Sequence, residues 1–307
     1  MNNVPVISLC LPTNGISEWV FPVLNSIYSQ NIDNSLFEIV VTDNGNNDDF
    51  YVKMQNYLKN HENLTYKKTN AYMFENQLEA LKLASGLFFK FVNHRYLFTE
   101  NSLKQLIDIV NENKDNKPVI FFSNGVLDEE LYELNNFDDF VRNLGRFASW
   151  TTGVGIWKDD YIKIPKDVKI DKISPHSCIL FSERKKTKYI INNFKFCEEL
   201  NVGHANKGSY DLFKTFGIEE FLITLNLYLD GDISAKTLKY IKEDYSYFVS
   251  QLYCDYYLEK KTCSYNLNGF NDSMDIFLNK KTVISMAKKI YIKRKVKKII
   301  KKILLRK

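Results

Sequence analysis

Short apolar runs alternate with helix-patterned segments along the first 120 residues, and this alternation leaves few folds open to the chain. The run Phe-Glu-Ile-Val-Val-Thr-Asp at 37–43 holds three consecutive apolar residues, Ile39, Val40 and Val41, instead of a strict alternation of apolar and polar residues. A strand of this kind is buried on both faces, as in parallel sheets that helices cover. The sequence therefore predicts an α/β fold, with a mainly parallel sheet and helices on both of its faces.

The expected elements follow in regular order up to residue 123. We expect strands at 5–11, 37–43, 64–68, 87–92 and 119–123, with helices at 17–29, 50–60, 74–85 and 101–111. After residue 205 the pattern becomes mostly helical, with expected helices at 211–229, 234–258 and 272–305. We therefore expect three parts: an α/β domain over 1–205, a helical extension over 206–280 and a C-terminal tail over 281–307.

Composition excludes several classes of protein. Hydrophobic residues make up 45% of the chain, and 22 Phe and 19 Tyr stand against 12 Gly and 6 Pro, which excludes low-complexity disorder. The sequence has no run of about 18 uncharged apolar residues and no basic N-terminal segment followed by an apolar one. We therefore expect neither a membrane-spanning helix nor a signal peptide. The five scattered cysteines fit reduced thiols in a cytoplasmic protein.

Charge is divided unevenly between the tail and the rest of the chain. Residues 281–307 hold 12 Lys and Arg and no Asp or Glu, so the remaining residues are net negative, with 30 basic against 37 acidic side chains. Apolar residues in the tail recur at steps of three and four, along one expected helical stripe. Lysines fill much of the remaining surface: Lys288, Lys289, Lys293, Lys297, Lys298, Lys301 and Lys302.

A helix with a lysine face and an aliphatic face suits the surface of an anionic membrane. We expect the protein to be peripheral on the inner face of the cell membrane. Packing of the tail on its own body, or a solvated tail, stays open as an alternative. Nucleic acid is a poor fit as partner, because the body is acidic and the apolar stripe would then have no purpose.

Polar residues follow three of the expected strands. They are Pro12-Thr13-Asn14, Asp43-Asn44-Gly45 and Asn93-His94-Arg95. Ligands of parallel sheets bind outside the carboxyl ends of the strands, so these segments form the expected site. No G-x-G-x-x-G follows the first strand and no G-K-[ST] occurs, which removes the main support for dinucleotide-binding and P-loop proteins.

The order of these segments resembles the start of a family 2 glycosyltransferase with the GT-A fold, of the bacterial surface-polysaccharide type. A strand with Pro-Thr-Asn is followed by a helix ending Ser-Ile-Tyr-Ser-Gln30 and by Glu-Ile-Val-Val-Thr-Asp43-Asn-Gly. The later stretch Asn76-Gln-Leu-Glu-Ala-Leu-Lys-Leu-Ala-Ser-Gly86 resembles the family's N-x-x-x-x-A-x-x-x-A-x-G segment before the central strand. The resemblance implies a GT-A, Rossmann-like domain with a C-terminal helical extension.

The resemblance also implies a nucleotide-sugar donor, most often a UDP-sugar. Pro12, Thr13 and Asn14 would line the nucleotide, and Asp43 would accept a hydrogen bond from the base or the ribose. Asn44, Asn76 and Asn93 complete the expected donor site. For Asp43 an ordinary role as a turn residue at a strand end stays open.

The chain departs from the family where an acidic D-x-D triplet normally holds Mg²⁺ or Mn²⁺ on the donor diphosphate. Here the triplet position reads His94-Arg95-Tyr96. We therefore expect no metal cofactor, with Arg95, helped by His94, neutralising the diphosphate in its place. The alternative is a catalytically inactive, transferase-like binding module that partners another glycosyltransferase.

Inverting transfer needs a base for the acceptor hydroxyl. The family's acidic pair falls near His176, which we take as the candidate base, with Asp171 second; a structural His176 stays open. The Gly-rich segment with Trp150, Gly153 and Gly155 resembles the acceptor side, and His204 and Lys207 lie in a polar loop that could cover the diphosphate.

The resemblance thus implies an inverting glycosyltransferase, and with the basic tail we expect it to move a sugar to a lipid-linked or cell-surface glycan in polysaccharide biosynthesis, such as capsule or lipopolysaccharide.

Overall fold

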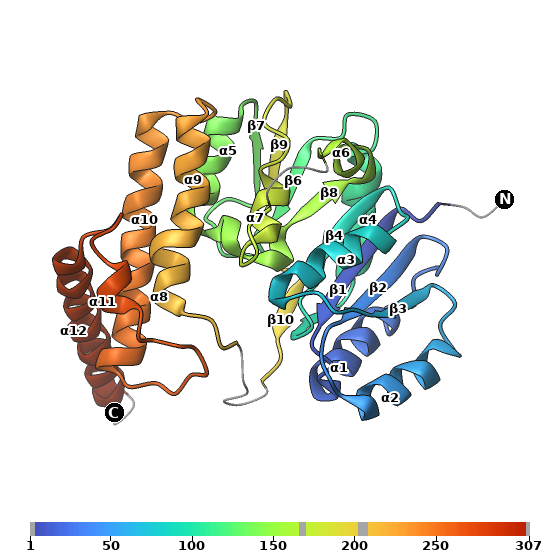
Figure 1. Cartoon of the computed structure of the whole chain (residues 1–307), viewed down its shortest axis with the longest axis horizontal. Helices are drawn as coiled ribbons and strands as arrows, with labels where there is room; N and C mark the ends of the chain where they lie inside the picture. Colours follow the sequence, from blue (N-terminus) through green and yellow to red (C-terminus); the bar gives the residue numbers. More distant parts are fainter. Residues whose placement is uncertain (1–3, 166–169, 202–207, 305–307) are drawn as a thin grey trace. The chain divides into compact units, whose positions relative to one another are not determined.

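The computed structural model of the chain describes residues 4–165, 170–201 and 208–304. Among these, one compact unit comprises 4–140 and 147–201, and a second comprises 141–146 and 208–304 (Figure 1). Each unit is described by itself. The expected boundaries at residues 205 and 280 stay predictions.

The first unit is built on a five-stranded sheet in the order β3-β2-β1-β4-β8. Its strands are β1 (Ile7–Thr13), β2 (Phe37–Asp43), β3 (Leu64–Lys68), β4 (Phe88–Phe91) and β8 (Gly155–Trp157). The first four run parallel, and β8 pairs antiparallel with β4. The predicted α/β class with a mainly parallel sheet is confirmed.

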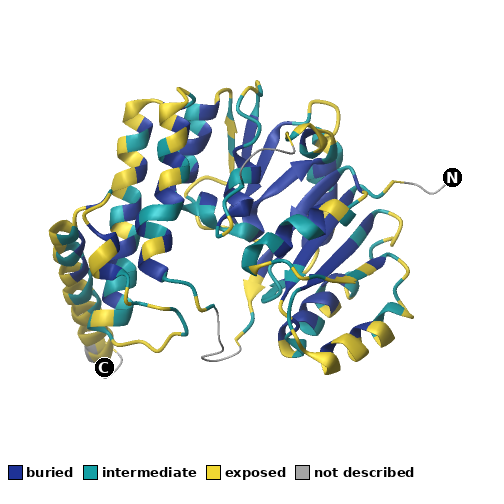
Figure 2. Ribbon diagram, in the orientation of Figure 1, coloured by how far each residue is buried: buried dark blue, intermediate teal, exposed yellow. Residues whose placement is uncertain are grey.

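Helices cover both faces of this sheet, which buries β1, β2, β4 and β8 almost completely, whereas the edge strand β3 is buried only at Leu64 (Figure 2). On one face α1 (Ser17–Tyr28), α2 (Asp48–Leu58) and α4 (Ser102–Asn113) supply apolar side chains to a single core with the strands. On the other face lie α3 (Asn76–Leu83) and α6 (Lys158–Lys163), whose Tyr161 contacts Phe89 edge to face. The short helix α7 (Pro175–Leu180) packs against α3 and β8.

The remaining strands of the first unit belong to two smaller sheets. The expected strand at 119–123 forms as β6 (Val119–Phe122), but it pairs with β9 (Tyr189–Asn192), which also pairs with β7 (Leu131–Leu134). A further pair joins β5 (Tyr96–Phe98) to β10 (Cys197–Glu199). The place beside β4 is taken by the three-residue β8, which is too short to carry a strand pattern in the sequence.

The second unit is helical. It contains α8 (Leu212–Lys214), η4 (Thr215–Glu219), α9 (Glu220–Leu229), α10 (Ala235–Tyr253), η5 (Cys254–Leu258), α11 (Phe270–Ser273) and α12 (Lys280–Leu304), while α5 (Phe137–Leu144) and η2 (Gly145–Ser149) connect the two units in sequence. The helix expected over 272–305 is interrupted, because Asp275 adopts a left-handed φ of 71° and α12 restarts after Asn279. Among the described residues no helix has the length and apolar character needed to cross a membrane.

A lysine lies inside the core of the first unit. Lys90, in the middle of β4, is fully buried and donates hydrogen bonds to the backbone carbonyls of Phe91 and Thr152. Its Nζ lies 5.1 Å from the ring centre of Phe122 and 4.9 Å from that of Phe196. Burial lowers the pKa of Lys90 to about 7. Lys90 thereby ties the turn at Thr152 to the end of the central strand.

Lys90→Met should change how stability depends on pH. The folded chain holds this amine at a lower pKa than the unfolded chain, so the folded state binds fewer protons. The contribution of Lys90 to the free energy of unfolding is therefore lost as pH falls towards about 7, by about 1.4 kcal/mol per pH unit. Urea unfolding between about pH 7 and pH 9.5 should show that wild type gains on the variant as pH rises. A constant difference would mean that the buried amine stays charged.

Candidate functional site

The carboxyl ends of β1 and β2 are held together by the buried amide of Asn76. Its Nδ2 donates to the carbonyls of Thr13 at 3.1 Å and Thr42 at 2.8 Å, and its Oδ1 accepts from Thr69 Oγ1 at 2.8 Å. Asn44 acts similarly, because its Nδ2 donates to the carbonyls of Ala71 and Met73. Both predicted site residues therefore fix loops at the ligand edge of the sheet.

Asp43 is fully buried at the end of β2 and faces the protein. Its Oδ1 accepts from the Gly45 amide at 2.8 Å, and its Oδ2 accepts from Tyr66 Oη at 2.8 Å and Lys68 Nζ at 3.2 Å. Burial and the bond to this carboxylate raise the pKa of Tyr66 above its usual range. The carboxylate orders the loop after β2, and its contact with a nucleotide stays a prediction.

The loops after β1 and β2 touch each other at a glycine. A Cβ on Gly45 would lie 1.9 Å from the backbone oxygen of Asn14, so only glycine allows this approach. Pro12 is half-buried, Thr13 is buried and Asn14 is exposed, which leaves Asn14 reachable from solvent. Thr13 Oγ1 accepts from the Gly15 amide and lies 2.8 Å from His94 Nδ1. The segment Pro12–Asn14, which we expect to line the nucleotide, is therefore in contact with the loop after β4.

Arg95 places a positively charged side chain at the carboxyl edge of the sheet, and no ion pair joins it to a carboxylate of the described residues. The turn after β4 is set by Asn93, whose Oδ1 accepts from the Arg95 amide at 3.0 Å. The guanidinium lies 5.4 Å from the ring centre of Trp19, and its Nε and Nη1 are buried with no hydrogen-bond partner among the described residues. Burial first, and the charge of Arg95 second, lower the pKa of His94 to about 3, so His94 is neutral.

His176 and Asp171 lie together at the start of α7. His176 Nε2 is 2.8 Å from the carbonyl of Ser149, and because a carbonyl only accepts, Nε2 carries the proton. Nδ1 is then an acceptor, and it is buried with no partner in the described part of the chain. Burial lowers the pKa of His176 to about 4, against the opposing effects of the Ser149 carbonyl and Asp171. Asp171 Oδ1 accepts from the amides of Ile173 and Ser174, which shapes the turn into α7.

Two residues at this edge were missed in the sequence. Gln77 Oε1 and Thr152 Oγ1 are buried and lack partners among the described residues, as do the Arg95 and His176 atoms. Gln77 follows Asn76 on α3, and Thr152 precedes β8, whose Gly155 pairs with Lys90 near the end of β4. Gln77 lies in the Asn76–Gly86 stretch, but neither its residue type nor its spacing, nor those of Thr152, indicate a binding role. The described side-chain atoms that are buried without a partner thus belong to four residues at the carboxyl edge of the sheet.

The predicted acceptor-side glycines serve packing. A Cβ on Gly153 would lie 2.2 Å from the Phe121 ring, and one on Gly155 would lie 2.4 Å from the Phe88 ring. The absence of a Cβ at these two positions makes room for the rings, and a contact of this segment with an acceptor stays a prediction. Trp150 is half-buried against Tyr96 and Phe196. His204 and Lys207 lie outside the described residues.

The residues at the triplet position do not fit a hard divalent cation. They are a neutral imidazole, a guanidinium and the phenol of Tyr96, whose pKa burial raises to about 12. Mg²⁺ and Mn²⁺ require oxygen ligands, mostly anionic ones. No group of three or more His, Cys, Asp or Glu within residues 4–165, 170–201 and 208–304 is arranged to hold a metal ion.

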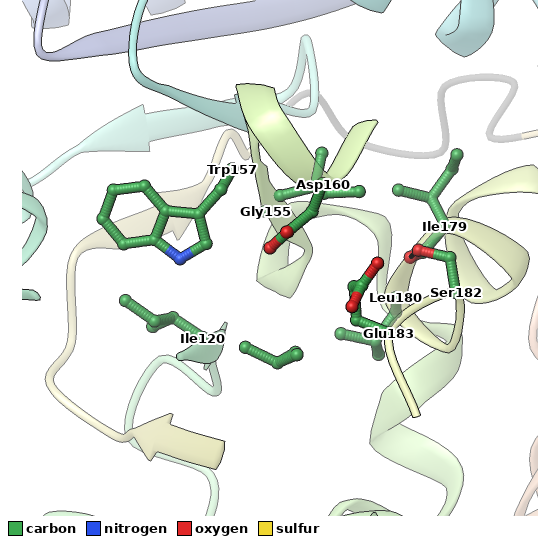
Figure 3. A pocket seen from close by; sticks show the side chains of 10 residues that line it. Ile120, Gly155, Trp157, Asp160, Ile179, Leu180, Ser182 and Glu183 are labelled. Carbon is green, nitrogen blue, oxygen red and sulfur yellow. Dashed lines mark hydrogen bonds between the residues drawn. The ribbon is translucent and has the colours of Figure 1, made fainter. Parts of the chain in front are cut away.

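A small pocket lies elsewhere in the first unit (Figure 3). Trp157, which lines it, pairs with Phe88 at the beginning of β4, so this wall is at the opposite end of the strand from Arg95. Asp160 in the wall is paired with Lys186 at 2.7 Å and Lys163 at 3.4 Å. Burial, and Asp160 next to it, raise the pKa of Glu183. Because its buried carboxylate is compensated, we assign this pocket no function.

Solved structures of S. aureus TarS have a similar fold. The crystal structure of S. aureus TarS 1-349 matches with a TM-score of 0.53 and 16% identity, over 80% of this chain and 71% of TarS 1-349. Its complex with UDP matches over 88% and 75% at a TM-score of 0.53, and its complex with UDP-GlcNAc over 80% and 72% at 0.52, both with 16% identity. The match covers 43% of a longer TarS structure.

No protein-family model and no curated protein matches the sequence. The structural similarity, at this identity, concerns the fold. The predicted GT-A fold is confirmed, and membership of family 2 stays a prediction.

Asp43→Asn should destabilise the first unit. The amide nitrogen of asparagine donates and would face the donors that now reach the carboxylate, either the Gly45 amide or Tyr66 and Lys68. The free energy of unfolding, measured in urea, should therefore fall by about 2–3 kcal/mol. Asp49→Asn, an exposed change in the first turn of α2, is the control and should stay within about 0.5 kcal/mol. Equal stability of the two variants would show that the buried contacts of Asp43 contribute little.

Proposed function

We propose that this chain is an inverting glycosyltransferase that uses a nucleotide sugar, with UDP as the nucleotide. The observation that carries the proposal is that two N–H groups of Arg95, at the carboxyl edge of the sheet, are buried and find no partner in the described part of the chain. A buried donor without a partner costs about 1–3 kcal/mol. A guanidinium matches phosphate oxygens in geometry and charge, so a diphosphate would satisfy these donors.

The loops around Arg95 suit a nucleoside diphosphate. Asn14 is exposed beside the loop that Asn44 and Asn76 hold in place, and Asn93 fixes the turn that presents Arg95. The structures of TarS with UDP and UDP-GlcNAc support UDP as the nucleotide. We propose that Arg95, with the neutral His94 beside it, stabilises the departing diphosphate without a metal ion.

The second half of the reaction is assigned to His176. As the acceptor hydroxyl attacks the anomeric carbon, its proton passes to Nδ1 of His176, and the nucleoside diphosphate leaves with the electron pair of the broken C–O bond. Attack from the face opposite the leaving group inverts the anomeric centre. Thr152 Oγ1 and Gln77 Oε1 are neutral groups at the same edge and suit hydroxyl groups of a sugar.

We further propose a lipid-linked or cell-surface glycan as the acceptor, at the inner face of the cell membrane, in the synthesis of a surface polysaccharide such as capsule or lipopolysaccharide. The lysine-rich α12 supports this location. An inactive transferase-like module that partners another glycosyltransferase is the second candidate, because His94, Arg95 and Tyr96 replace the carboxylates that transferases of this kind use.

Arg95 should replace a metal ion in turnover. Hydrolysis of UDP-sugars by wild type should continue in EDTA, and Arg95→Gln should lower kcat/KM by about 10²–10³-fold, as loss of a charge-stabilising group does. The release of UDP measures both effects. Lys104→Gln, an exposed change on α4, should leave the rate unchanged. Absence of turnover with every nucleotide sugar, despite binding, would favour the inactive module.

His176→Ala should lower turnover by about 10²–10⁴-fold while UDP still binds, because only proton transfer is lost. Since the pKa of His176 is about 4, wild-type activity should be level around neutral pH and fall as pH drops towards about 4, where Nδ1 becomes protonated. His61→Ala is the control, because His61 stacks on Tyr57 away from this edge. Retained activity in His176→Ala would leave Asp171 as the base to test.

A further inference from the structure

The C-terminal helix α12 consists of two halves with different surroundings. In the first half Val283 and Ala287 are fully buried, and α12 runs beside α10 (Figure 1). In the second half Ile292, Val296 and Ile299 are 61%, 49% and 56% exposed (Figure 2). The single stripe expected from the sequence is therefore divided. Its first half packs within the second unit and its second half does not.

An ion-pair cluster marks the change between the halves. Arg294 Nη1 pairs with Asp255 and lies 3.4 Å from Glu259 Oε2, and Lys298 Nζ lies 4.0 Å from Glu259 Oε1. Both carboxylates belong to or adjoin η5. The cluster fixes which side of the helix faces η5, because Arg294 lies on the same side as Val283 and Ala287 at 3.6 residues per turn.

The exposed apolar residues lie on the other side of the helix. Steps of four and three from Ile292 through Val296 to Ile299 keep them on one stripe, which Ile300 and Leu304 widen, at 51% and 67% exposure. Lys293 and Lys295 flank this stripe at 3.6 residues per turn, and no Asp or Glu occurs over 292–304. The outward stripe is thus the apolar part of a strongly cationic surface.

We propose that residues 292–304 form a docking surface for an anionic lipid membrane. The helix lies in the plane of the interface, with the Ile292–Val296–Ile299 stripe at the level of the acyl chains and the lysines at the anionic headgroups. The ion pairs of Arg294 hold the stripe outward, so that the second unit stays in water while the helix binds. This inference is independent of the reaction assigned to Arg95 and His176.

Charge decides between a membrane and other occupants of this face. A second copy of the helix would bring lysines opposite lysines around the same apolar stripe, which repel each other. A nucleic acid would satisfy the lysines but leave the stripe in water. A surface of anionic headgroups over acyl chains meets both parts of the helix, with opposite charge and with apolar contact.

Vesicle flotation with the full chain tests the proposal. Wild type should float with vesicles of phosphatidylglycerol and phosphatidylcholine and not with phosphatidylcholine alone, and high salt should weaken binding. The triple variant Ile292→Gln, Val296→Gln, Ile299→Gln keeps the charge and suits a helix, yet its partition coefficient should fall at least about tenfold. Lys293→Gln with Lys295→Gln should reduce the preference for anionic lipid by about tenfold or more, because each lysine near the surface adds to the attraction.

Ile162→Gln is the matched control, because Ile162 is 67% exposed on α6 in the first unit, and it should bind vesicles as wild type does. UDP binding should be the same in every variant, which separates this test from that of the transferase. Three results would overturn the proposal: equal flotation of the stripe variant, no flotation of wild type, or a wild-type dimer in sedimentation that the stripe variant dissociates.

Discussion

The amide of Asn76 holds together the part of the first unit on which every proposed contact depends. The carbonyls of Thr13 and Thr42 lie at the ends of β1 and β2, and buried carbonyls need donors. One side chain supplies both hydrogen bonds from the first residue of α3. The Thr13 carbonyl also accepts from the backbone amide of Asn44 at 3.1 Å. Helix α3, the loop after β1 and the loop after β2 are thereby fixed relative to each other, and Gln77 is set beside them.

Buried polar groups at this edge divide into two kinds. Asp43 and Lys90 are inside the protein with their partners, which are Tyr66, Lys68 and the Gly45 amide for the acid and two carbonyls for the amine. Arg95, Gln77, Thr152 and His176 each have buried side-chain atoms that lack a partner among the described residues. A protein tolerates an unpaired buried group chiefly where another molecule or water completes it. The difference therefore separates residues that build the site from residues that suit a ligand.

The fold could be predicted from the sequence because a strand that is buried on both faces carries consecutive apolar residues, as Phe37–Asp43 does at Ile39, Val40 and Val41. The strand at 119–123 was found but its sheet was not, since pairing with β9 depends on contacts some seventy residues apart that leave no local pattern. The three-residue β8 gave no pattern at all. The burial of Lys90 could not be predicted either. A single lysine in Phe-Phe-Lys-Phe is usually exposed to solvent, and only the structure shows its two carbonyl partners.

The sequence indicates which residues lie near the candidate site but does not indicate which way their side chains point. The rule that ligands bind beyond the carboxyl ends of parallel strands led to Asn14, Asn44 and Arg95 without any coordinates. The direction of a side chain is a different matter. Asp43 accepts hydrogen bonds from groups of this chain, and Gly153 lies directly against the ring of Phe121; contact of either residue with a ligand stays a prediction. Residue type alone cannot separate these orientations.

The same limit applies to the C-terminal helix, where the periodicity of the apolar residues was correct and their common stripe was not. A helix has 3.6 residues per turn, so a series that skips from steps of three and four to a step of two, as from Ile290 to Ile292, moves to another side. Val283 and Ala287 then face the body of the second unit, while Ile292 and Val296 face away from it. Because of that one step, α12 packs against its own unit with one side and exposes a second apolar stripe on the other. The lysines around the exposed stripe favour an anionic partner.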